Sequence, residues 1–576
     1  MSADQFDYVI VGGGSAGSVL ANRLSAAGCS VCVLEAGPRD TNRYIHIPAG
    51  FVKTLHDPAV TWRFQSEPGE WTGGRRIETT QGRVLGGSSS INGMVFVRGQ
   101  AQDYDGWARR GNPGWGYAEL LPYFKRLERR IGAADEHYRG RDGALPVTDP
   151  DWRHPLCDAF IDGAAGLGFA RNPDYNGASQ AGTGYYQRVI HQQRRVSAAR
   201  AFLYPALKSG LVDVRTEALA SAIMFDGKRA VGVRYLPGGV ADGAADAPRE
   251  VRARKEVIVS AGTFNSPKLL QLSGIGPAAL LQSRGIEVRH ALAGVGENLT
   301  DHYTARIVAR VKGSQTINSC ASGPRLLGEI AKWSLGRPSI LGLSAALVYA
   351  FGKSRAQLSS PDFTVIFSPA SYREGFLGKL DTFPGMTSGA WQMRPLSTGH
   401  VRVVSDDPLA APLIQPNYLT HEEDRRVFLA AVRTARSILA TPQLAPYYES
   451  EVLPGAAQVS DDELLDFARR YGSSCYHYAG TCRMGPDSDP TAVVDQELKV
   501  RGLDGLRVVD ASVMPSSPSA NTYASTLVIA ERAADFILGK AQAGNARSEE
   551  APRPRAVTTA ATAAATAATR EAEAVV

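Results

Sequence analysis

The sequence predicts a mixed α/β protein, α+β overall, in which two domains are interleaved along the chain. Three observations support this prediction. Residues 6–11 form a continuous apolar run that leads into a glycine-rich turn and then into apolar residues at helical spacing. Glycine-rich segments recur near residues 86, 262 and 294, and the segments between them lack such glycine motifs. The chain has 576 residues, which is enough for two large domains.

The first elements follow the order strand, turn, helix, strand. Phe6–Val11 suits a strand buried on both faces of a parallel sheet, and Ser30–Leu34 suits the next strand. Residues 41–78 lose this regularity and are rich in Pro, Gly and Trp, and residues 82–99 form a Gly/Ser-rich loop that leads into an apolar segment. The apolar residues at helical spacing between the two strands are Ala16, Val19, Leu20 and Leu24.

A helix–loop region then extends to about residue 190, and residues 212–235 indicate short strands with a turn at Asp226–Gly227. Glu256–Ser260 predicts a further strand, followed by a glycine and a helix. Residues 311–464 alternate strands and helices without a glycine motif. The strand-like Leu506–Val509 and the helix-like Leu527–Leu538 complete the predicted fold.

Composition excludes several classes of protein. Hydrophobic residues make up 44% and charged residues 21%, which argues against a collagen, a disordered chain or a disulfide-stapled miniprotein. A net charge of +6 spread over this length predicts no nucleic-acid binding, because such binding needs clustered basic residues. Residues 541–576 lack large apolar side chains, and we expect this tail to be disordered.

The six cysteines are scattered, so we expect no disulfide framework and a reducing, cytoplasmic compartment. Cys29 and Cys32 form a C-x-x-C that could be a redox pair, but their local sequence indicates a buried strand with both sulfurs as small hydrophobes. The N-terminus lacks a secretory signal pattern, and the longest uncharged apolar stretch, Ser339–Gly352, is too short to span a bilayer. We therefore expect a soluble protein, and peripheral contact with the inner face of the membrane stays open.

Gly12, Gly14 and Gly17 form a G-x-G-x-x-G motif between the first strand and the first helix. The first glycine permits a tight turn, the second lets the backbone approach a pyrophosphate, and the third allows close packing of helix on strand. The pyrophosphate would lie at the positive N-terminus of the helix. Glu35 ends the second strand, where a carboxylate binds ribose hydroxyls. The pattern predicts a bound dinucleotide rather than a simple glycine turn, but it does not separate FAD from NAD.

Later motifs resemble those of one known family. Residues 82–95, GRVLGGSSSINGMV, closely resemble the first signature of the glucose–methanol–choline (GMC) oxidoreductases, and residues 262–276 look like the second. The resemblance covers residues 5 to about 540, and the most similar members look like bacterial choline dehydrogenases and aliphatic alcohol dehydrogenases. It continues through GVGENLTDH at 294–302, DPLAAPLIQPNYL at 407–419, YHYAGTCRMG at 476–485 and VVDASVMPSSPSANT at 508–522.

The resemblance implies FAD and a Rossmann-like FAD-binding domain interleaved with a substrate domain built on an antiparallel sheet with helices. Some members attach the flavin through a histidine near the Asn92 motif. This sequence has Ile91 and no histidine there, so we expect non-covalent FAD. The sequence has no second C-x-x-C to complete a zinc site, and we expect no metal. The implied FAD-binding domain comprises residues 1–40, 79–105, 190–310 and 465–540, and the substrate domain comprises residues 41–78, 106–189 and 311–464.

The glycine motif and the resemblance together give the predicted cofactor-binding residues. In the family, the Asn92 position contacts the flavin ring and phosphates, the backbone at the Ala220 position holds adenine, and the Asp510–Ala511 segment returns to the pyrophosphate. The predicted set is Gly12, Gly14, Ser15, Gly17, Glu35, Ala36, Gly86, Gly87, Asn92, Val95, Ala220, Tyr476, Asp510, Ala511, Asn521 and Thr522.

His477 and Asn521 are the predicted catalytic residues. Hydride abstraction from an alcohol carbon leaves a proton on the oxygen, and neutral imidazole suits its removal because its pKa lies near working pH. His477 matches the family's catalytic histidine, and Asn521 matches the partner position, whose amide can hydrogen-bond the substrate oxygen. A histidine among aromatic residues is otherwise most often a satisfied core residue, and we assign such a structural role to His302, in a segment that looks like a flavin-domain turn.

Two departures from the family bear on the substrate. Tyr478 follows the catalytic histidine where proline is common, which could reshape the pocket wall. Choline enzymes carry a glutamate that pairs with the quaternary ammonium, and an approximate alignment places Leu347 there. A cation needs an anion or an aromatic cage, so we predict a neutral, largely apolar alcohol, aliphatic or aromatic.

The leading hypothesis is therefore FAD-dependent oxidation of a primary alcohol to the aldehyde. His477 would take the hydroxyl proton, flavin N5 the hydride, and a quinone or other carrier the electrons. Because fold does not fix function, an alcohol oxidase that uses O2, a choline dehydrogenase, and a lyase or photodecarboxylase on the same scaffold stay open. The expected partners are a small-molecule alcohol and an electron acceptor, and the oligomeric state is not predicted.

Overall fold

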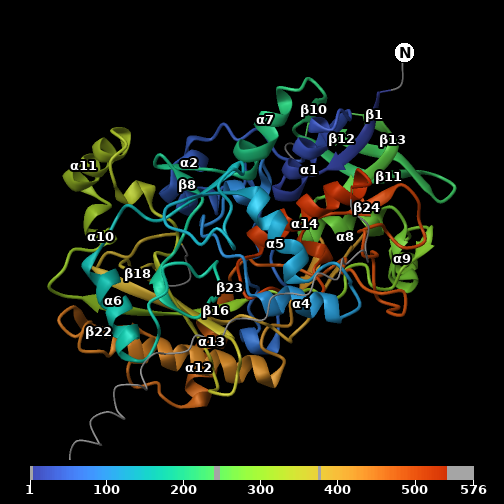
Figure 1. Ribbon diagram of the computed structural model, residues 1–576. Helices are drawn as coiled ribbons and strands as arrows, with labels where there is room; N and C mark the ends of the chain where they lie inside the picture. Colours follow the sequence, from blue (N-terminus) through green and yellow to red (C-terminus); the bar gives the residue numbers. More distant parts are fainter. Residues whose placement is uncertain (1–3, 239–246, 374–377, 541–576) are drawn as a thin grey trace, which may run out of the picture. The chain divides into compact units, whose positions relative to one another are not determined.

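Two seven-stranded sheets organise the computed structural model, which describes residues 4–238, 247–373 and 378–540. The two sheets lie in different parts of the molecule (Figure 1). The tail 541–576, for which the sequence predicts disorder, lies outside the described residues.

The first sheet is mainly parallel and contains the predicted N-terminal strands. Its strands are β1 (Gln5–Val11), β2 (Val31–Leu34), β10 (Val212–Arg215), β11 (Ala218–Asp226), β12 (Arg229–Pro237), β13 (Arg249–Val259) and β24 (Leu506–Val508). Their order is β10-β2-β1-β13-β12-β11, with β24 paired to β13. β10, β2, β1, β13 and β24 run parallel, whereas β12 and β11 are added antiparallel around the predicted turn at Asp226–Gly227. This is a Rossmann-type arrangement, as the glycine motif predicted.

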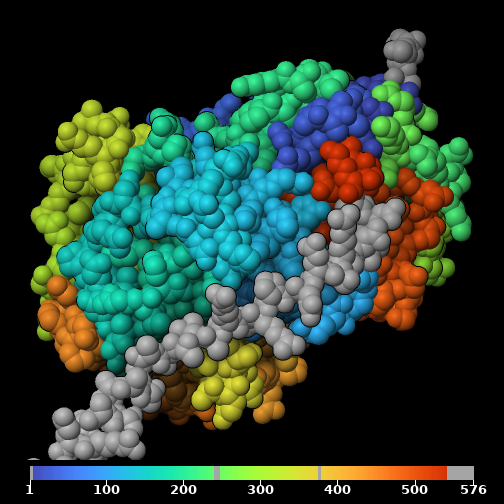
Figure 2. Space-filling model, in the orientation of Figure 1, coloured from blue at the N-terminus to red at the C-terminus, as the bar shows by residue number. Residues whose placement is uncertain are grey.

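Helices from both ends of the chain pack together beside this sheet. α1 (Ser15–Ala26) follows the first glycine turn and buries the predicted helical stripe, and α14 (Thr522–Ile537) packs against it. Arg23 of α1 and the buried Glu531 of α14 form an ion pair of 2.8 Å. Figure 2 shows the blue N-terminal and red C-terminal segments side by side. The C-terminal segment thus completes the domain that the N-terminal motif begins.

The second sheet is antiparallel throughout. Its strands are β7 (Gly182–Tyr185), β16 (Tyr303–Val311), β17 (Val348–Gly352), β18 (Phe363–Ser368), β19 (Gly385–Gln392), β22 (Tyr448–Leu453) and β23 (Ser473–Ser474). Their order is β22-β16-β19-β18-β17-β7, with β23 paired to β16. β16 therefore belongs to this sheet, although the predicted boundary left most of it in the FAD-binding domain. The remaining domain boundaries stay a prediction.

Three helices cover one face of the antiparallel sheet: α6 (Pro155–Gly166), α12 (Glu422–Leu439) and α13 (Asp461–Tyr471). Side chains alternate between the faces of a strand. Ala305 and Ile307 of β16 point into the apolar core with these helices, so Arg306 between them points to the opposite face. That opposite face, with Gly389 and Trp391 of β19, lines the large cavity described below.

Shorter elements connect the two sheets. The remaining α-helices of the described ranges are α2 (Arg43–His46), α3 (Phe51–Thr54), α4 (Ala101–Arg109), α5 (Tyr117–Leu127), α7 (Tyr204–Leu207), α8 (Gly262–Leu272), α9 (Ala278–Ser283), α10 (Ile317–Cys320) and α11 (Gly323–Ser334). Two-stranded pairs are β3 (Thr61–Trp62) with β4 (Gln81–Gly82), β5 (Glu128–Ile131) with β6 (Leu145–Thr148), β8 (Ile190–His191) with β9 (Arg194–Arg195), β14 (Ile275–Gly276) with β15 (His290–Ala291), and β20 (His400–Arg402) with β21 (Leu413–Gln415).

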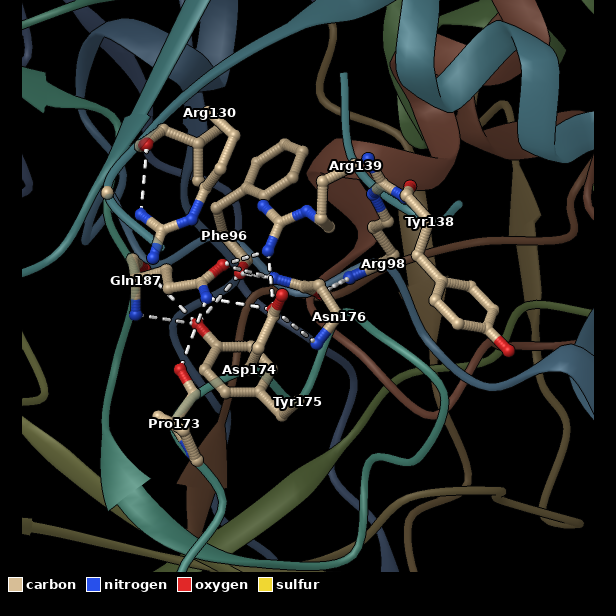
Figure 3. Close-up of polar contacts among 12 residues, drawn as sticks. Phe96, Arg98, Arg130, Tyr138, Arg139, Pro173, Asp174, Tyr175, Asn176 and Gln187 are labelled. Carbon is tan, nitrogen blue, oxygen red and sulfur yellow. Dashed lines mark hydrogen bonds and ion pairs between the residues drawn. The ribbon is translucent and has the colours of Figure 1, made fainter. Parts of the chain in front are cut away.

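A buried ionic network supports the segment that follows the second glycine loop. The Glu128 carboxylate lies between two guanidinium groups, 2.6 Å from Arg98 Nη2 and 2.8 Å from Arg139 Nε. Arg139 also pairs with Asp174 at 2.5 Å, and the backbone N–H of Arg98 donates to Asn176 Oδ1. Figure 3 shows these arginines, Asp174 and Asn176 directed at one another. The network therefore fixes the backbone near residue 98 to two distant loops.

Two further sequence predictions can be compared with the structure. Cys29 and Cys32 are free thiols and both are buried, with Cys32 in β2, as the buried-strand interpretation of the C-x-x-C requires. Burial raises the pKa of the Cys32 thiol to about 12, which makes it a poor nucleophile. Within the described ranges, every helix is too short or too polar to cross a bilayer.

Candidate active site

Two glycine loops meet at the start of α1 and form a cradle. A Cβ at Gly12, where φ is +103°, would lie 2.3 Å from the carbonyl oxygen of Ser260, and one at Gly17 would lie 2.0 Å from that of Gly12. A Cβ at Gly87 would lie 2.8 Å from the Cα of Gly14. The Cβ position of Gly14 itself has only the Gly87 Cα nearby, at 3.8 Å. Glycine is therefore needed for close packing at three of these positions, whereas Gly14 leaves open backbone for a pyrophosphate.

Glu35 joins the end of β2 to the first glycine loop. Its Oε2 accepts the backbone N–H of Gly13 and its Oε1 accepts that of Gly37, both at 2.9 Å. Burial raises the pKa of Glu35 to about 7, and the two hydrogen bonds oppose that rise. Each oxygen keeps a lone pair, so the carboxylate can also accept ribose hydroxyls. Glu35 thus shapes the loop as well as lining the cavity.

Asp510 links the C-terminal segment to the glycine at the start of α8. Its Oδ2 accepts the backbone N–H of Gly262 at 2.9 Å and the hydroxyl of Ser266 at 2.5 Å. Its Oδ1 accepts the backbone N–H of Ser512 at 2.8 Å. Asp510 therefore connects the segment after β24 to the start of α8, whereas Glu35 follows β2 on the other side of β1.

Asn92 is held by a residue that the sequence did not indicate. Its Oδ1 accepts from the backbone of Met94 at 3.1 Å and from Nη1 of the buried Arg195 at 2.7 Å. Arg195 also donates to the carbonyl oxygens of Ile45 and Ser89. The amide nitrogen of Asn92 makes no hydrogen bond within the described ranges, so it can serve a ligand in the cavity that Asn92 lines.

One cavity joins the cradle to the face of the antiparallel sheet. Of the predicted site residues, Gly17 and Gly86 lie outside its wall, as their turn and packing positions require. The others line it: Gly12, Gly14, Ser15, Glu35, Ala36, Gly87, Asn92, Val95, Ala220, Tyr476, His477, Asp510, Ala511, Asn521 and Thr522. Residues that the sequence did not single out also line it, among them Lys268, Arg306, Tyr372, Trp391 and Tyr523.

His477 and Asn521 lie in contact at the junction of the two halves of this cavity. His477 Nε2 is 2.8 Å from Asn521 Nδ2, and Asn521 is the N-cap of α14. The backbone N–H of His477 donates to the buried Asp301 at 2.8 Å. Tyr476 has φ +63°, a conformation rare for a bulky residue. The backbone at the predicted catalytic histidine is thus held firmly in an unusual conformation, as is common at functional sites.

His302 is part of this site rather than of a remote turn. Its Nδ1 lies 2.9 Å from His477 Nδ1, and its Nε2 lies 2.8 Å from the carbonyl oxygen of Met393. A carbonyl only accepts, so His302 carries its proton on Nε2 and its Nδ1 accepts. His477 must then donate from Nδ1, which leaves His477 Nε2 unprotonated. The sequence interpretation of His302 as a purely structural histidine is therefore corrected, because its contact with His477 could not be seen in the sequence.

Burial keeps both imidazoles neutral. It lowers the pKa of His477 well below its ordinary value, and the neighbouring His302 lowers it further. Burial also lowers the pKa of His302 to about 4. A neutral His477 with a bare Nε2 facing the cavity can take a proton, whereas a protonated one could not.

The two departures from the family have different outcomes. Tyr478 does line the cavity; its ring centroid lies 4.5 Å from that of Phe264, and its hydroxyl oxygen lies 2.9 Å from Ser474 Oγ. Leu347, however, points into the core beneath α6 and α12, and Ala345 and Ala346 line the cavity instead. The expectation that Leu347 lines the substrate pocket is therefore wrong, and the preceding residue, Ala346, lines the cavity.

The residues present fit FAD. The glycine cradle leaves backbone open where a pyrophosphate would lie, the N-terminus of α1 supplies unpaired N–H groups, and Glu35 lies at the end of the next strand. His477 and Asn521, the predicted catalytic pair, line the same cavity. Fold and site together define a class, the FAD-binding oxidoreductases.

Comparison with known proteins identifies the family within this class: the chain belongs to the GMC oxidoreductases. The model of the N-terminal GMC oxidoreductase domain matches residues 6–304, and that of the C-terminal domain matches residues 395–530. The family inferred from the sequence motifs is thus confirmed, and with it FAD as the cofactor.

Three similar proteins illustrate the relationship. An oxygen-dependent choline dehydrogenase of Brucella anthropi is 40% identical over 550 residues, which is 95% of this chain and 97% of the relative. An alcohol dehydrogenase [acceptor] of Pseudomonas putida is 39% identical over 539 residues, 93% of this chain and 96% of the relative. The crystal structure of pyridoxine 4-oxidase from Mesorbium loti superposes with a TM-score of 0.83 at 30% identity, covering 93% of this chain and 100% of that one.

Proposed function

We propose that this protein oxidises a primary alcohol to the aldehyde, with His477 as the base and Asn521 holding the substrate oxygen. The observation that supports this most directly is the 2.8 Å contact between His477 Nε2 and Asn521 Nδ2 in the cavity that also contains the FAD cradle. The P. putida relative is named an alcohol dehydrogenase [acceptor]. Non-covalent attachment of FAD is part of the same proposal.

The proton moves along a defined path in this proposal. The alcohol O–H would replace the Asn521 N–H as the donor to the single lone pair of His477 Nε2, and the released N–H of the Asn521 amide would donate to the alcohol oxygen. FAD, when bound, supplies the acceptor for the hydride that leaves the alcohol carbon. As His477 gains a proton, its Nδ1–H bond to His302 becomes a charge-assisted hydrogen bond and strengthens. His302 Nδ1 accepts this bond before and after the transfer, so His302 holds the His477 ring in one orientation without itself changing its proton.

The residues that line the cavity near His477 suit a substrate whose carbon chain is uncharged and largely apolar. Trp391, whose ring centroid lies 6.3 Å from that of His477, lines this region with Val95 and Ile366. Within the described part of the chain, the only carboxylates in the cavity wall are Glu35 and Asp510. Both accept backbone N–H groups in the FAD cradle. A quaternary ammonium would therefore lack an anion, which argues against choline despite the names of several relatives.

The electron acceptor in this proposal is a quinone or other carrier, and peripheral contact with a membrane stays a prediction. An O2-using enzyme is the second candidate, because relatives such as the B. anthropi protein are named oxygen-dependent. Dye reduction measured against peroxide release during turnover separates the two. Rapid dye reduction with little peroxide would support the carrier, and the reverse would support the oxidase.

Anaerobic mixing of the holoenzyme with aliphatic and aromatic alcohols in the dark tests the proposed reaction. We expect the flavin absorbance near 450 nm to bleach and one aldehyde to form for each flavin reduced. Absence of bleaching with every alcohol would contradict the proposal. Release of carbon dioxide from a carboxylic acid under blue light, without bleaching by alcohols, would instead favour a photodecarboxylase.

A further inference from the structure

Arg306 places a cation in the wall of the substrate side of the cavity. It lies on the face of β16 opposite the helical core and is only partly buried. Its Nη1 donates to the hydroxyl of Ser473 at 2.7 Å. Across residues 4–238, 247–373 and 378–540, no carboxylate lies within ion-pair distance of this guanidinium. The Arg306 guanidinium has five N–H donors, and four of them are left for a ligand.

The sheet register places Arg306 on the same strand face as Trp391, which packs near His477. Arg306 lies opposite Gly389 on β19, and Trp391, which packs near His477, is two residues further along that strand. Two residues of strand span about 7 Å. Arg306, Gly389 and Trp391 all line the same cavity. A substrate whose hydroxyl contacts His477 can therefore reach Arg306 with its other end.

The surroundings of Arg306 suit a small anion. Tyr372, Ser368 and Thr387 line the same end of the cavity. The hydroxyls of Ser368 and Thr387 donate to the carbonyl oxygens of Ala345 and Ala370 respectively. Arg306 opposes the rise in the pKa of Tyr372 that burial causes, as a nearby positive charge should. The pocket thus combines one cationic group with neutral polar groups at its far end and apolar groups near His477.

We propose that Arg306 binds a carboxylate at the far end of the alcohol, so that the substrate is a hydroxy acid with an apolar chain between its two polar ends. A guanidinium matches a carboxylate geometrically through two parallel N–H donors, and a single positive charge balances a single negative one. The same charge repels a quaternary ammonium. This inference rests on the proposed alcohol oxidation. It changes the substrate predicted from the sequence in one respect: the end far from the hydroxyl carries a carboxylate, and the chain between the two ends stays apolar.

Paired substrates test the inference. We would measure kcat/KM by anaerobic dye reduction for a series of ω-hydroxyalkanoates, such as 6-hydroxyhexanoate, and for their methyl esters. In the unchanged enzyme we expect the best acid to exceed its ester by about tenfold or more, with the preference weakening at high salt. Arg306→Gln should remove that preference by lowering kcat/KM for the acid about tenfold while leaving the ester within about threefold. Arg306→Lys should keep part of it.

Two further measurements make the result decisive. Arg310→Gln is the matched control, since Arg310 lies on the same strand but is exposed and packs on Phe383 outside the cavity; it should leave both substrates unchanged. Hexanoate, which cannot be oxidised, should bind the unchanged holoenzyme in a calorimetric titration and bind Arg306→Gln about tenfold more weakly. FAD content and melting temperature would show that each variant is folded.

The outcomes separate the two proposals. Equal use of acids and esters by the unchanged enzyme, or an equal effect of Arg306→Gln on both, would overturn the carboxylate site while leaving alcohol oxidation intact. Failure of acids, esters and simple alcohols alike to reduce the flavin would overturn the proposed function itself.

Discussion

The Nδ1 atoms of His302 and His477 lie 2.9 Å apart, and the opposite ring nitrogen of His302 lies 2.8 Å from the carbonyl oxygen of Met393. A backbone carbonyl thus determines which nitrogen of His477, the proposed base, carries a proton, although the carbonyl lies one full imidazole away from it. His302 is a positioning residue in this arrangement.

Replacing His302 should disturb the base without removing it. In His302→Leu, His477 Nδ1 loses its acceptor, so the imidazole can place its proton on Nε2 and lose its basic nitrogen. We expect the rate of flavin reduction by alcohol to fall by about 10²–10⁴-fold, the range for loss of a general base. His302→Gln keeps one acceptor and one donor and should recover part of the rate. Stopped-flow absorbance measures both; equal rates for the two variants would show that the tautomer is set in another way.

The pH dependence of flavin reduction should reflect the buried environment of His477. Only the neutral imidazole can accept the proton, so the rate falls as pH drops through the pKa of His477. Because burial lowers that pKa well below 6.5, we expect a constant rate through pH 6.5 and a decline only at lower pH. Stopped-flow rates with saturating alcohol, with FAD content checked at each pH, provide the test. A half-maximal rate at or above pH 6.5 would contradict the assignment.

The contact between the two glycine loops should limit FAD binding. A Cβ at Gly87 would lie 2.8 Å from the backbone of Gly14, so Gly87→Ala must push the loops apart. We expect FAD to bind about tenfold more weakly or worse, since a loss of about 1.4 kcal/mol suffices. Fluorescence titration of apoprotein with FAD measures the affinity. Gly328→Ala in α11 is the control, because nothing lies within 4 Å of its Cβ position; unchanged affinity in both variants would argue against the cradle.

The buried network should contribute strongly to stability. Arg139→Met removes one of the two cations beside Glu128 and the partner of Asp174 (Figure 3). Breaking a buried ion pair by removing one partner costs about 3–5 kcal/mol. The urea midpoint, followed by tryptophan fluorescence, should fall accordingly. Arg171→Ala breaks the exposed pair with Asp162 and should cost no more than about 1 kcal/mol; similar effects of the two variants would refute the predicted difference.

Much of the FAD half could be predicted because its signals are local. Gly12, Gly14 and Gly17 lie within one strand–turn–helix unit, and Glu35 ends the neighbouring strand, so spacing along the chain is enough to locate them. Asn92, His477 and Asn521 come from separate segments. Their residue types within family motifs identified them, and the structure brings them to one cavity.

The substrate half could not be predicted in this way. Arg306 and Trp391 reach the cavity through the register of β16 with β19, and Leu347 misses it because a shift of one residue turns a side chain to the opposite face. Arg195 and His302 act through contacts with Asn92 and His477 that are distant in sequence. No local pattern records such pairings, so these positions required the fold.

The most direct test of the account is anaerobic flavin reduction in His477→Ala. The side chain contributes no contact to the glycine cradle, so we predict normal FAD content and an unchanged visible spectrum. Reduction by the best alcohol should be slower by about 10²–10⁴-fold. Reduction at the rate of the unchanged enzyme would contradict the assignment of His477 as the base.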